Sequence, residues 1–115
     1  MDGPTMMGEL RGERCKPCEG GVAPLRPEQI GPMLRGLDAW TASNGAISKE
    51  YTFGNYHKTI AFVNAVAWIS HVENHHPELQ VGFGSCKVSY WTHAINGLSE
   101  NDFICAAKID ALLEA

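Results

Sequence analysis

Hydrophobic and polar positions recur with two different periods along the chain, and each period predicts a kind of element. Residues 27–37 place apolar side chains at helical intervals, so a helix is expected there. Pro32 is unsuited to a helix interior, so the helix either starts near Gly31 or is kinked, and Gly36 favours its end. Residues 40–53 alternate in the manner of strands around Asn44 and Gly45, a pair that favours a tight hairpin turn. The first half of the chain is thus predicted to run from a helix into a β-hairpin.

The second half begins with the longest predicted helix, residues 55–74, whose apolar residues form a wide stripe. Pro77 indicates that this helix ends before it, because the residue before a proline avoids helical geometry. Two strands are expected next, over residues 79–83 and 86–93. Residues 100–113 are predicted to form the last helix.

The predicted order of elements is therefore α-β-β-α-β-β-α. Tight turns join the strands within each pair, which requires antiparallel pairing. The apolar faces of the helices and strands must be buried against one another. The sequence therefore predicts an α+β fold, a four-stranded antiparallel sheet with three helices on one face.

Length and composition fit one small domain. The chain has 115 residues, of which 44% are hydrophobic and 19% are charged, a balance typical of a folded globular domain. Residues 1–14 show no apolar periodicity and are expected to be a flexible leader. The single domain is accordingly expected over residues 15–115.

Charge and hydropathy argue against two classes of partner. A formal net charge of −4 leaves no basic surface to neutralise a phosphate backbone, so no direct contact with nucleic acid is expected. The longest apolar stretch, residues 60–69, is far too short to cross a bilayer, and no signal-peptide core precedes it. A cytoplasmic location without a membrane partner is expected.

The four cysteines are expected to be thiols in that reducing setting. Cys15 and Cys18 have the spacing of half a zinc knuckle or of a redox pair, and both interpretations stay open. A second close pair is missing, because Cys86 and Cys105 lie far apart in the sequence, so no metal is predicted here. Cys105 is expected to be a small core residue.

Four of the five histidines fall within residues 71–93 and are the main candidates for chemistry. His71 and His75 lie four residues apart at the end of the long helix, where they are expected to share one face. His76 and His93 follow. Because histidine titrates near neutrality, such a group suits general acid and base catalysis. Spacing alone leaves two alternatives open, namely a divalent-metal site built from His71, His75 and His93, or surface histidines without a role.

A longer pattern runs through these histidines. It consists of His71, His75, His76, Pro77, Phe83, His93 and Asp102. Its spacings resemble those of the pterin-4a-carbinolamine dehydratases, and a pattern of this length is far more specific than a pair of histidines. The segments HVENHHPEL, VGFG, WTHAINGLSENDF and AAKID add to the resemblance, which is closest to bacterial-type members and covers about residues 15–115.

The resemblance implies a reaction. The substrate would be a 4a-hydroxytetrahydropterin, formed when an aromatic amino acid hydroxylase uses its pterin cofactor. Loss of water gives a quinonoid dihydropterin, which a reductase can recycle. The family needs neither a metal nor a redox cofactor for this dehydration, so none is expected here.

The resemblance also implies roles for individual residues. His75, His76 and His93 form the expected catalytic group, with His75 and His93 as acid and base and His76 orienting the pterin. The expected substrate-binding positions are His71, Asn74, Pro77 and Thr92. Asp102 is expected to support the site, although its place three residues after Ser99 equally suits a helix capping box.

The same resemblance bears on partners. Members of the family associate as homodimers or homotetramers, so a homo-oligomer is expected. Some relatives act instead as protein-binding modules, either as dimerisation cofactors of a transcription factor or as assembly chaperones. Because this chain retains His75, His76 and His93, the enzyme is preferred over the protein-binding module.

Overall fold

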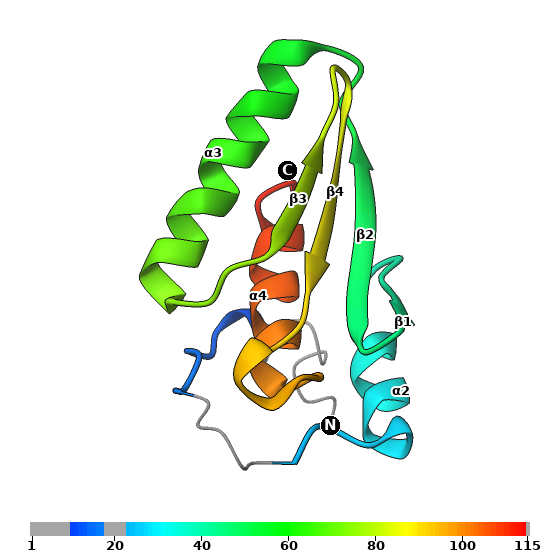
Figure 1. Cartoon of the computed structure of the whole chain (residues 1–115). Helices are drawn as coiled ribbons and strands as arrows, with labels where there is room; N and C mark the ends of the chain where they lie inside the picture. The colour runs from blue at the N-terminus through cyan, green and yellow to red at the C-terminus, as the bar shows by residue number, and fades with distance from the viewer. Residues whose placement is uncertain (1–9, 18–22, 115) are drawn as a thin grey trace, which may run out of the picture.

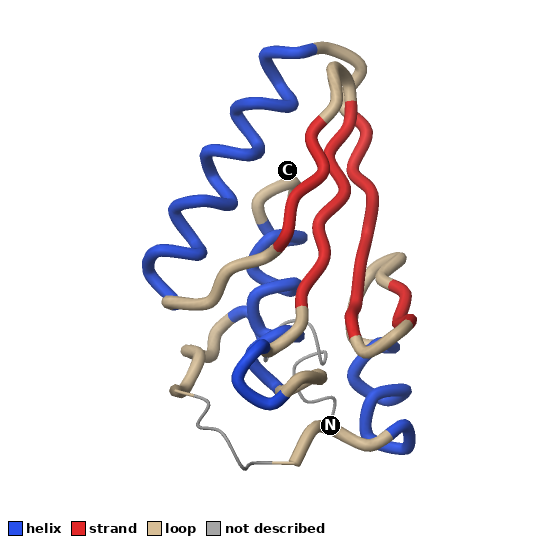
Figure 2. The backbone as a smooth tube through the Cα atoms, in the orientation of Figure 1, coloured by secondary structure: helices blue, strands red, loops and turns tan. Residues whose placement is uncertain are grey.

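The computed structural model of the chain describes residues 10–17 and 23–114. Its elements follow the predicted order α-β-β-α-β-β-α, so the α+β fold class is confirmed (Figure 1 and Figure 2). The elements are α2 (Pro27–Arg35), β1 (Thr41–Ser43), β2 (Ala46–Thr52), α3 (Tyr56–Glu73), β3 (Glu78–Val81), β4 (Ser85–Tyr90), the 3₁₀ turn η1 (His93–Ile95) and α4 (Glu100–Ala111). Within those residues, none of the helices combines the length and the apolar character that a bilayer crossing requires.

The strands form one antiparallel sheet in the order β1-β2-β4-β3. At its centre Ile47 lies opposite Tyr90, and Tyr51 lies opposite Cys86. These four side chains are buried, whereas the alternate positions of both strands are polar apart from Ala46 and are not buried. Buried residues of α3 and α4 join them in one core, so these two helices cover the apolar face of the sheet. Figure 1 shows α2 beside β1.

The predicted hairpin turn is confirmed. Asn44 and Gly45 both have positive φ angles, 53° and 79°, which is the geometry of a type I′ turn. That turn matches the right-handed twist of the flanking strands, and glycine reaches such φ values without steric cost. The local sequence therefore places β1 against β2, from Thr41 opposite Ser48 to the turn.

Helix α2 begins at Pro27, includes Pro32 and ends at the residue before Gly36, whereas α4 ends two residues earlier than predicted. Helix α2 ends at Arg35, because the N–H of Gly36 bonds back to the carbonyl of Met33 at 3.1 Å. Helix α4 ends at Ala111, where the N–H of Leu112 likewise reaches back three residues, at 3.0 Å. Such tightened last turns are common at helix ends, and the hydrophobic periodicity does not reveal them.

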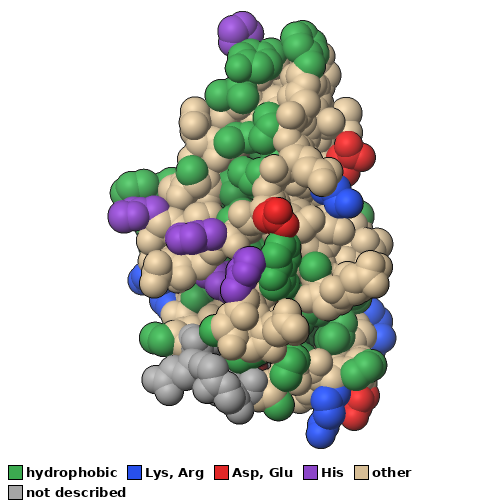
Figure 3. All heavy atoms as spheres, viewed as in Figure 1, with side chains coloured by type: hydrophobic (Ala, Val, Ile, Leu, Met, Phe, Trp, Pro, Cys, Tyr) green, Lys and Arg blue, Asp and Glu red, His purple; other side chains and the backbone are tan. Residues whose placement is uncertain are grey.

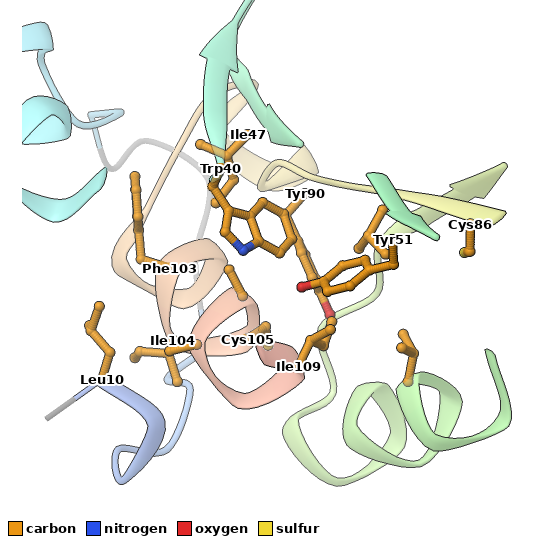
Figure 4. Packing of buried hydrophobic residues seen from close by; sticks show 14 of the residues in the cluster. Leu10, Trp40, Ile47, Tyr51, Cys86, Tyr90, Phe103, Ile104, Cys105 and Ile109 are labelled. Atoms are coloured by element: carbon orange, nitrogen blue, oxygen red, sulfur yellow. The ribbon is translucent and has the colours of Figure 1, made fainter. Parts of the chain in front are cut away.

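Helix α4 supplies the centre of the core. Phe103, Cys105 and Ile109 are fully buried, and Figure 4 shows them in one cluster with the rings of Trp40 and Tyr51. The expectation that Cys105 is a small core residue is confirmed. Because residues 96–99 alone separate η1 from α4, this packing also holds the loop that follows β4 against the rest of the molecule.

A buried carboxylate ties the end of α4 to the sheet. Asp110 is 8% exposed and accepts three hydrogen bonds, from Trp40 Nε1 at 3.1 Å, Lys49 Nζ at 2.9 Å and Tyr51 Oη at 2.5 Å. A buried charge costs free energy unless it is paired and hydrogen-bonded, and these three donors satisfy Asp110.

Leu10 joins the core although it lies in the stretch expected to be a leader. Its side chain is 5% exposed and belongs to the same cluster as Ile104. Lys108 of α4 donates to the carbonyl of Arg11 at 2.8 Å. The first nine residues of the predicted leader lie outside the described part of the chain. The described part of that stretch is attached to α4, a long-range contact that local periodicity does not predict.

Helix α3 lies within one residue of its predicted bounds and ends in a Schellman motif. Asn55 caps its N-terminus by accepting from the N–H of Lys58 at 2.9 Å. Asn74 adopts the left-handed conformation, φ 53°, and the N–H of His75 bonds back to the carbonyl of Ser70 at 3.2 Å. His75 therefore lies beyond the helix, and the expectation that it shares a helical face with His71 is wrong.

The chain leaves the sheet earlier than the alternating pattern predicts. Strand β4 ends at Tyr90, and Thr92 forms only an isolated bridge with Gly97. His93 begins η1, so its predicted place at the end of a strand is wrong. Gly97 is required here, because a Cβ on it would lie 2.7 Å from Cβ of Pro24. Pro24 therefore packs closely against this loop, and the N–H of Leu25 bonds to the carbonyl of Leu98 at 2.8 Å.

Candidate active site

Three of the candidate histidines line one cavity of about 700 Å³, where the end of α3 meets η1 and the start of α4. Its size lies within the range of roughly 300–1,000 Å³ that is usual for ligand pockets. Figure 3 shows histidine side chains gathered on one face of the molecule. The predicted residues that line this cavity are His75, His76, His93, Asn74, Pro77 and Thr92.

The cavity histidines follow the end of α3 because of two local signals. Asn74 stops the helix in the left-handed conformation, which asparagine tolerates better than most residues. Pro77 then restricts the backbone of His76 to extended geometry. Consecutive residues in such a segment point in different directions, so His75 and His76 meet a ligand from different sides.

His75 is held by a buried carboxylate. Its Nε2 lies 2.6 Å from Oδ1 of Asp102, whose side chain is fully buried, while the side chain of His75 is 13% exposed. An ionised carboxylate only accepts hydrogen bonds, so Nε2 of His75 carries the proton. In the neutral ring, Nδ1 is then the nitrogen with the free lone pair. The bond to Asp102 therefore fixes both the orientation and the tautomer of the His75 ring.

Asp102 has further partners that fix its orientation. Its Oδ2 accepts from the hydroxyl of Thr92 at 2.9 Å and from the N–H of Ser99 at 3.0 Å. The second bond is half of the predicted capping box with Ser99, which is confirmed. One carboxylate therefore caps α4, fixes Thr92 and holds His75, so the capping and supporting roles coexist.

Tyr90 forms a flat platform beneath His75. The two rings are stacked, with centroids 5.5 Å apart and planes within 8°. Burial raises the pKa of Tyr90, so the phenol stays neutral under the imidazole. This stacking and the bond to Asp102 leave His75 little freedom to rotate.

His76 and His93 are exposed, in contrast to His75. The ring of His93 lies 4.5 Å from that of Trp91, centroid to centroid. The cavity therefore combines one anchored histidine with two that solvent can reach. Solvent access lets a histidine regain or lose a proton between reactions.

The structure does not bring His71 to the cavity. Its side chain is exposed on α3 and lies 5.3 Å from the ring of Trp68, between centroids. Phe83 of the sequence pattern is also remote, since it is 72% exposed beyond β3 and contacts Tyr56. Their positions in the pattern therefore do not reflect contact with the cavity.

The divalent-metal alternative built from His71, His75 and His93 is not assembled. Across residues 10–17 and 23–114, no three or more His, Cys, Asp or Glu side chains lie together in a way that could hold a metal ion. Cys18, half of the spaced cysteine pair, lies outside those residues.

The sequence did not point to the other residues that line the cavity, which are residues 15–17, Val72, Glu73, Ala94 and Asn101. Glu73 could have been suspected, because this charged residue follows Val66 and Ser70 along the buried face of α3. Burial raises the pKa of Glu73, but the Cys15 N–H and the charges of Lys108 and Arg14 outweigh burial and leave that pKa below its ordinary value.

Comparison with known proteins identifies the family of this chain. The model of the family described as pterin 4 alpha carbinolamine dehydratase matches residues 23–112. A provisionally named pterin-4-alpha-carbinolamine dehydratase of Nitrosospira multiformis is 56% identical over 110 residues, 96% of this chain and 97% of that protein. One from Legionella pneumophila (strain Corby) is 50% identical over 111 residues, 94% of this chain and 98% of its own. The chain belongs to the pterin 4 alpha carbinolamine dehydratase family.

Two solved structures share the fold. A transcriptional coactivator/pterin dehydratase of Brucella melitensis superposes with a TM-score of 0.76 at 27% identity, over 79% of this chain and 99% of its own. A pterin dehydratase-like RuBisCO assembly factor of the α-carboxysome gives 0.57 at 25% identity, over 69% and 92%. The same architecture thus occurs in proteins described by different activities.

Proposed function

We propose that the chain dehydrates 4a-hydroxytetrahydropterins to quinonoid dihydropterins by histidine acid/base catalysis, and so recycles the pterin of aromatic amino acid hydroxylation in the cytoplasm. The proposal rests on one observation. His75, His76 and His93 line the same cavity, and His75 is hydrogen-bonded to the buried Asp102. Membership of the dehydratase family supports the substrate class.

The reaction requires two proton transfers, and the site offers a group for each. The lone pair of pterin N5 expels the hydroxyl from C4a, and an acid protonates that hydroxyl so that it leaves as water. A base then removes the proton from N5. Because the bond to Asp102 fixes the tautomer of His75 and leaves the lone pair of Nδ1 free, we assign His75 as the base. His93 is exposed and can regain a proton from solvent between turnovers, so we assign it as the acid.

His76 is assigned to substrate binding rather than proton transfer. His76→Ala is expected to raise KM several-fold and to leave kcat within about threefold, because a contact made equally in ground and transition states affects KM alone. Steady-state kinetics of the purified variant measure both. His76→Asn is the matched control, since the family pattern accepts asparagine at this position, and it should keep KM nearer the wild-type value. A collapsed kcat with an unchanged KM would show that His75 and His76 have exchanged roles.

The direct test is an assay of dehydration with freshly generated 4a-hydroxytetrahydropterin, followed by the absorbance of the quinonoid product. The protein should accelerate dehydration well above the spontaneous rate and should keep that activity in the presence of a chelator. Absence of acceleration would refute the enzyme. Complete inhibition by the chelator would instead indicate a metal-dependent reaction.

A protein-binding role on the same fold is the alternative. It is favoured by the descriptions of the two solved relatives, one a transcriptional coactivator/pterin dehydratase and the other a RuBisCO assembly factor. The presence of all three cavity histidines favours the enzyme. A partner captured by a protein that does not accelerate dehydration would support the alternative.

We also expect a homodimer or homotetramer. Strands β1 and β3 are the edges of the sheet, and unpaired edges invite pairing with another chain. Val81 on β3 and Trp68 on α3 are 47% and 65% exposed, which provides apolar surface for an interface. Light scattering should return at least twice the 12.5 kDa mass of one chain. A mass of one chain at micromolar concentration would contradict this expectation.

A further inference from the structure

One wall of the cavity comes from outside the region that the family model matches. Residues 14–17, which we call the strap, place Cys15, Lys16 and Pro17 on the lining, whereas the family match begins at residue 23. The Nitrosospira relative aligns over 96% of this chain, an extent that necessarily includes the strap. The strap therefore belongs to the group of close relatives and is not part of the common family core.

Two buried side chains hold the strap. Glu73, whose side chain is 4% exposed, accepts from the N–H of Cys15 at 2.7 Å and pairs with Nε of Arg14 at 3.0 Å. Asn101, 6% exposed, accepts from the N–H of Lys16 at 3.0 Å and donates to its carbonyl at 2.6 Å. Asn101 thus satisfies both backbone groups of a single strap residue, as a neighbouring strand would.

Both anchors adjoin the catalytic residues in the chain. Glu73 lies two residues before His75, and Asn101 directly precedes Asp102. The same short segments therefore carry the His75–Asp102 pair and hold the strap, and both His75 and the strap line the one cavity. This arrangement fixes the distance between the reacting groups and the strap.

A third contact, between two cysteine sulfurs, can be used to test whether the strap is docked. Sγ of Cys15 lies 3.5 Å from Sγ of the buried Cys105 on α4. Disulfide formation requires the two sulfurs to come within bonding distance, so only a docked strap allows Cys15 and Cys105 to be joined.

Lys16 is the charged side chain that the strap adds to the cavity lining. It is exposed, and none of the ion pairs found within residues 10–17 and 23–114 involves it. An ammonium group donates hydrogen bonds and accepts none. A ligand group that meets Lys16 should therefore be an acceptor, either a hydroxyl or an anion.

In a pterin, the carbon that carries the variable substituent, C6, is bonded directly to the reacting N5. If N5 faces His75, that substituent lies next to the reacting edge of the pterin, in the cavity that the strap also lines. We propose, on the basis of the dehydratase function proposed above, that the strap determines which C6 substituent is accepted. Lys16 selects substituents that carry hydrogen-bond acceptors, and Asn101 is the positioning residue that holds Lys16 in place.

The first test compares three 4a-hydroxytetrahydropterins, with a 6-methyl group, a 6-dihydroxypropyl group and a carboxylate-bearing 6-substituent. Lys16→Met should lower the kcat/KM preference for an acceptor-bearing substituent over methyl by about fivefold, the scale of one exposed hydrogen bond to a charged donor. Lys16→Arg, which keeps a cationic donor, should retain most of the preference. Lys87→Met, on the exposed polar face of β4, is the matched control and should not alter it.

The three substrates separate the chemistry of the substituent. A loss confined to the carboxylate substrate would show selection for an anion, and a loss for both acceptor substrates would show selection for acceptors in general. Either result supports the proposal that the strap determines which substituent is accepted. An unchanged preference in Lys16→Met refutes it while leaving the dehydratase intact. A wild-type protein that dehydrates none of the three refutes the function and this inference together.

The second test examines Asn101 in a Cys18→Ser background, so that Cys15 cannot pair with Cys18. Diamide, which takes up the two thiol hydrogens, should link Cys15 to Cys105 readily in this background and more slowly in Asn101→Ala. The reduced Asn101→Ala protein should lose substituent preference, and the disulfide-linked form should regain it. A merely structural Asn101 would lower the melting temperature without changing either readout. Wild-type cross-linking and preference in Asn101→Ala would overturn the positioning role.

Discussion

His75→Ala and His93→Ala are each expected to lower kcat for dehydration by about 10²-fold or more, the usual scale for loss of a general acid or base. The two variants remove different proton transfers, so neither histidine should compensate for the other. Steady-state rates over a range of pH measure the effect. His57→Ala is the matched control, because this exposed histidine lies near the start of α3 and does not line the cavity.

The two variants should differ in stability. His93 is exposed, so His93→Ala should unfold at nearly the wild-type temperature. His75→Ala removes a ring stacked on Tyr90 and leaves the buried Asp102 without one of its donors, so its melting temperature should fall. Normal activity in both variants would show that the cavity histidines are not the acid and base.

Asp102→Asn is expected to lower kcat by about 10²-fold, because the wrong tautomer of His75 removes its contribution as a base. The carboxylate accepts from His75 on one oxygen and from Thr92 and Ser99 on the other. An amide has only one acceptor oxygen, so its NH₂ group must face one of these donors. If it faces His75, Nε2 becomes the acceptor and Nδ1 takes the proton, which removes the free lone pair from the cavity.

The control for Asp102→Asn is Asp110→Asn on the same helix. Asp110 is also a buried carboxylate with several donors, but those donors are Trp40, Lys49 and Tyr51, away from the cavity. Both variants should lose about 1–3 kcal/mol of unfolding free energy, since each leaves a buried donor unpaired. Only Asp102→Asn should lose kcat. If Asp102→Asn folds stably and keeps the wild-type kcat, Asp102 serves only as a helix cap and has no part in catalysis.

Local chemistry in the sequence determined the order of elements and several of their ends. The Asn44-Gly45 turn, the Asn55 cap of α3 and the Ser99 capping box each depend on residues within four positions of one another. Hydrophobic periodicity identified the helices and strands because burial acts on whole faces. These features could be predicted because they do not depend on where the rest of the chain lies.

The candidate site was predicted less completely. The family resemblance named residues that do line the cavity: His75, His76, His93, Asn74, Pro77 and Thr92. The pattern also grouped His71 with His75, since spacing alone cannot show that Asn74 ends the helix between them in the left-handed conformation. Alternation placed His93 on a strand, whereas the bridge between Thr92 and Gly97 turns the chain into η1.

Only the tertiary structure decided which distant segments meet. The bond from His75 to Asp102 spans 27 positions, the strap reaches Glu73 across 58, and it reaches Asn101 across 85. No periodicity links residues so far apart, because their contact depends on how the helices pack on the sheet. The sequence by itself therefore determined the elements and the reactive residue types. The packing of α3 and α4 determined that a histidine, its buried carboxylate and the strap form one site.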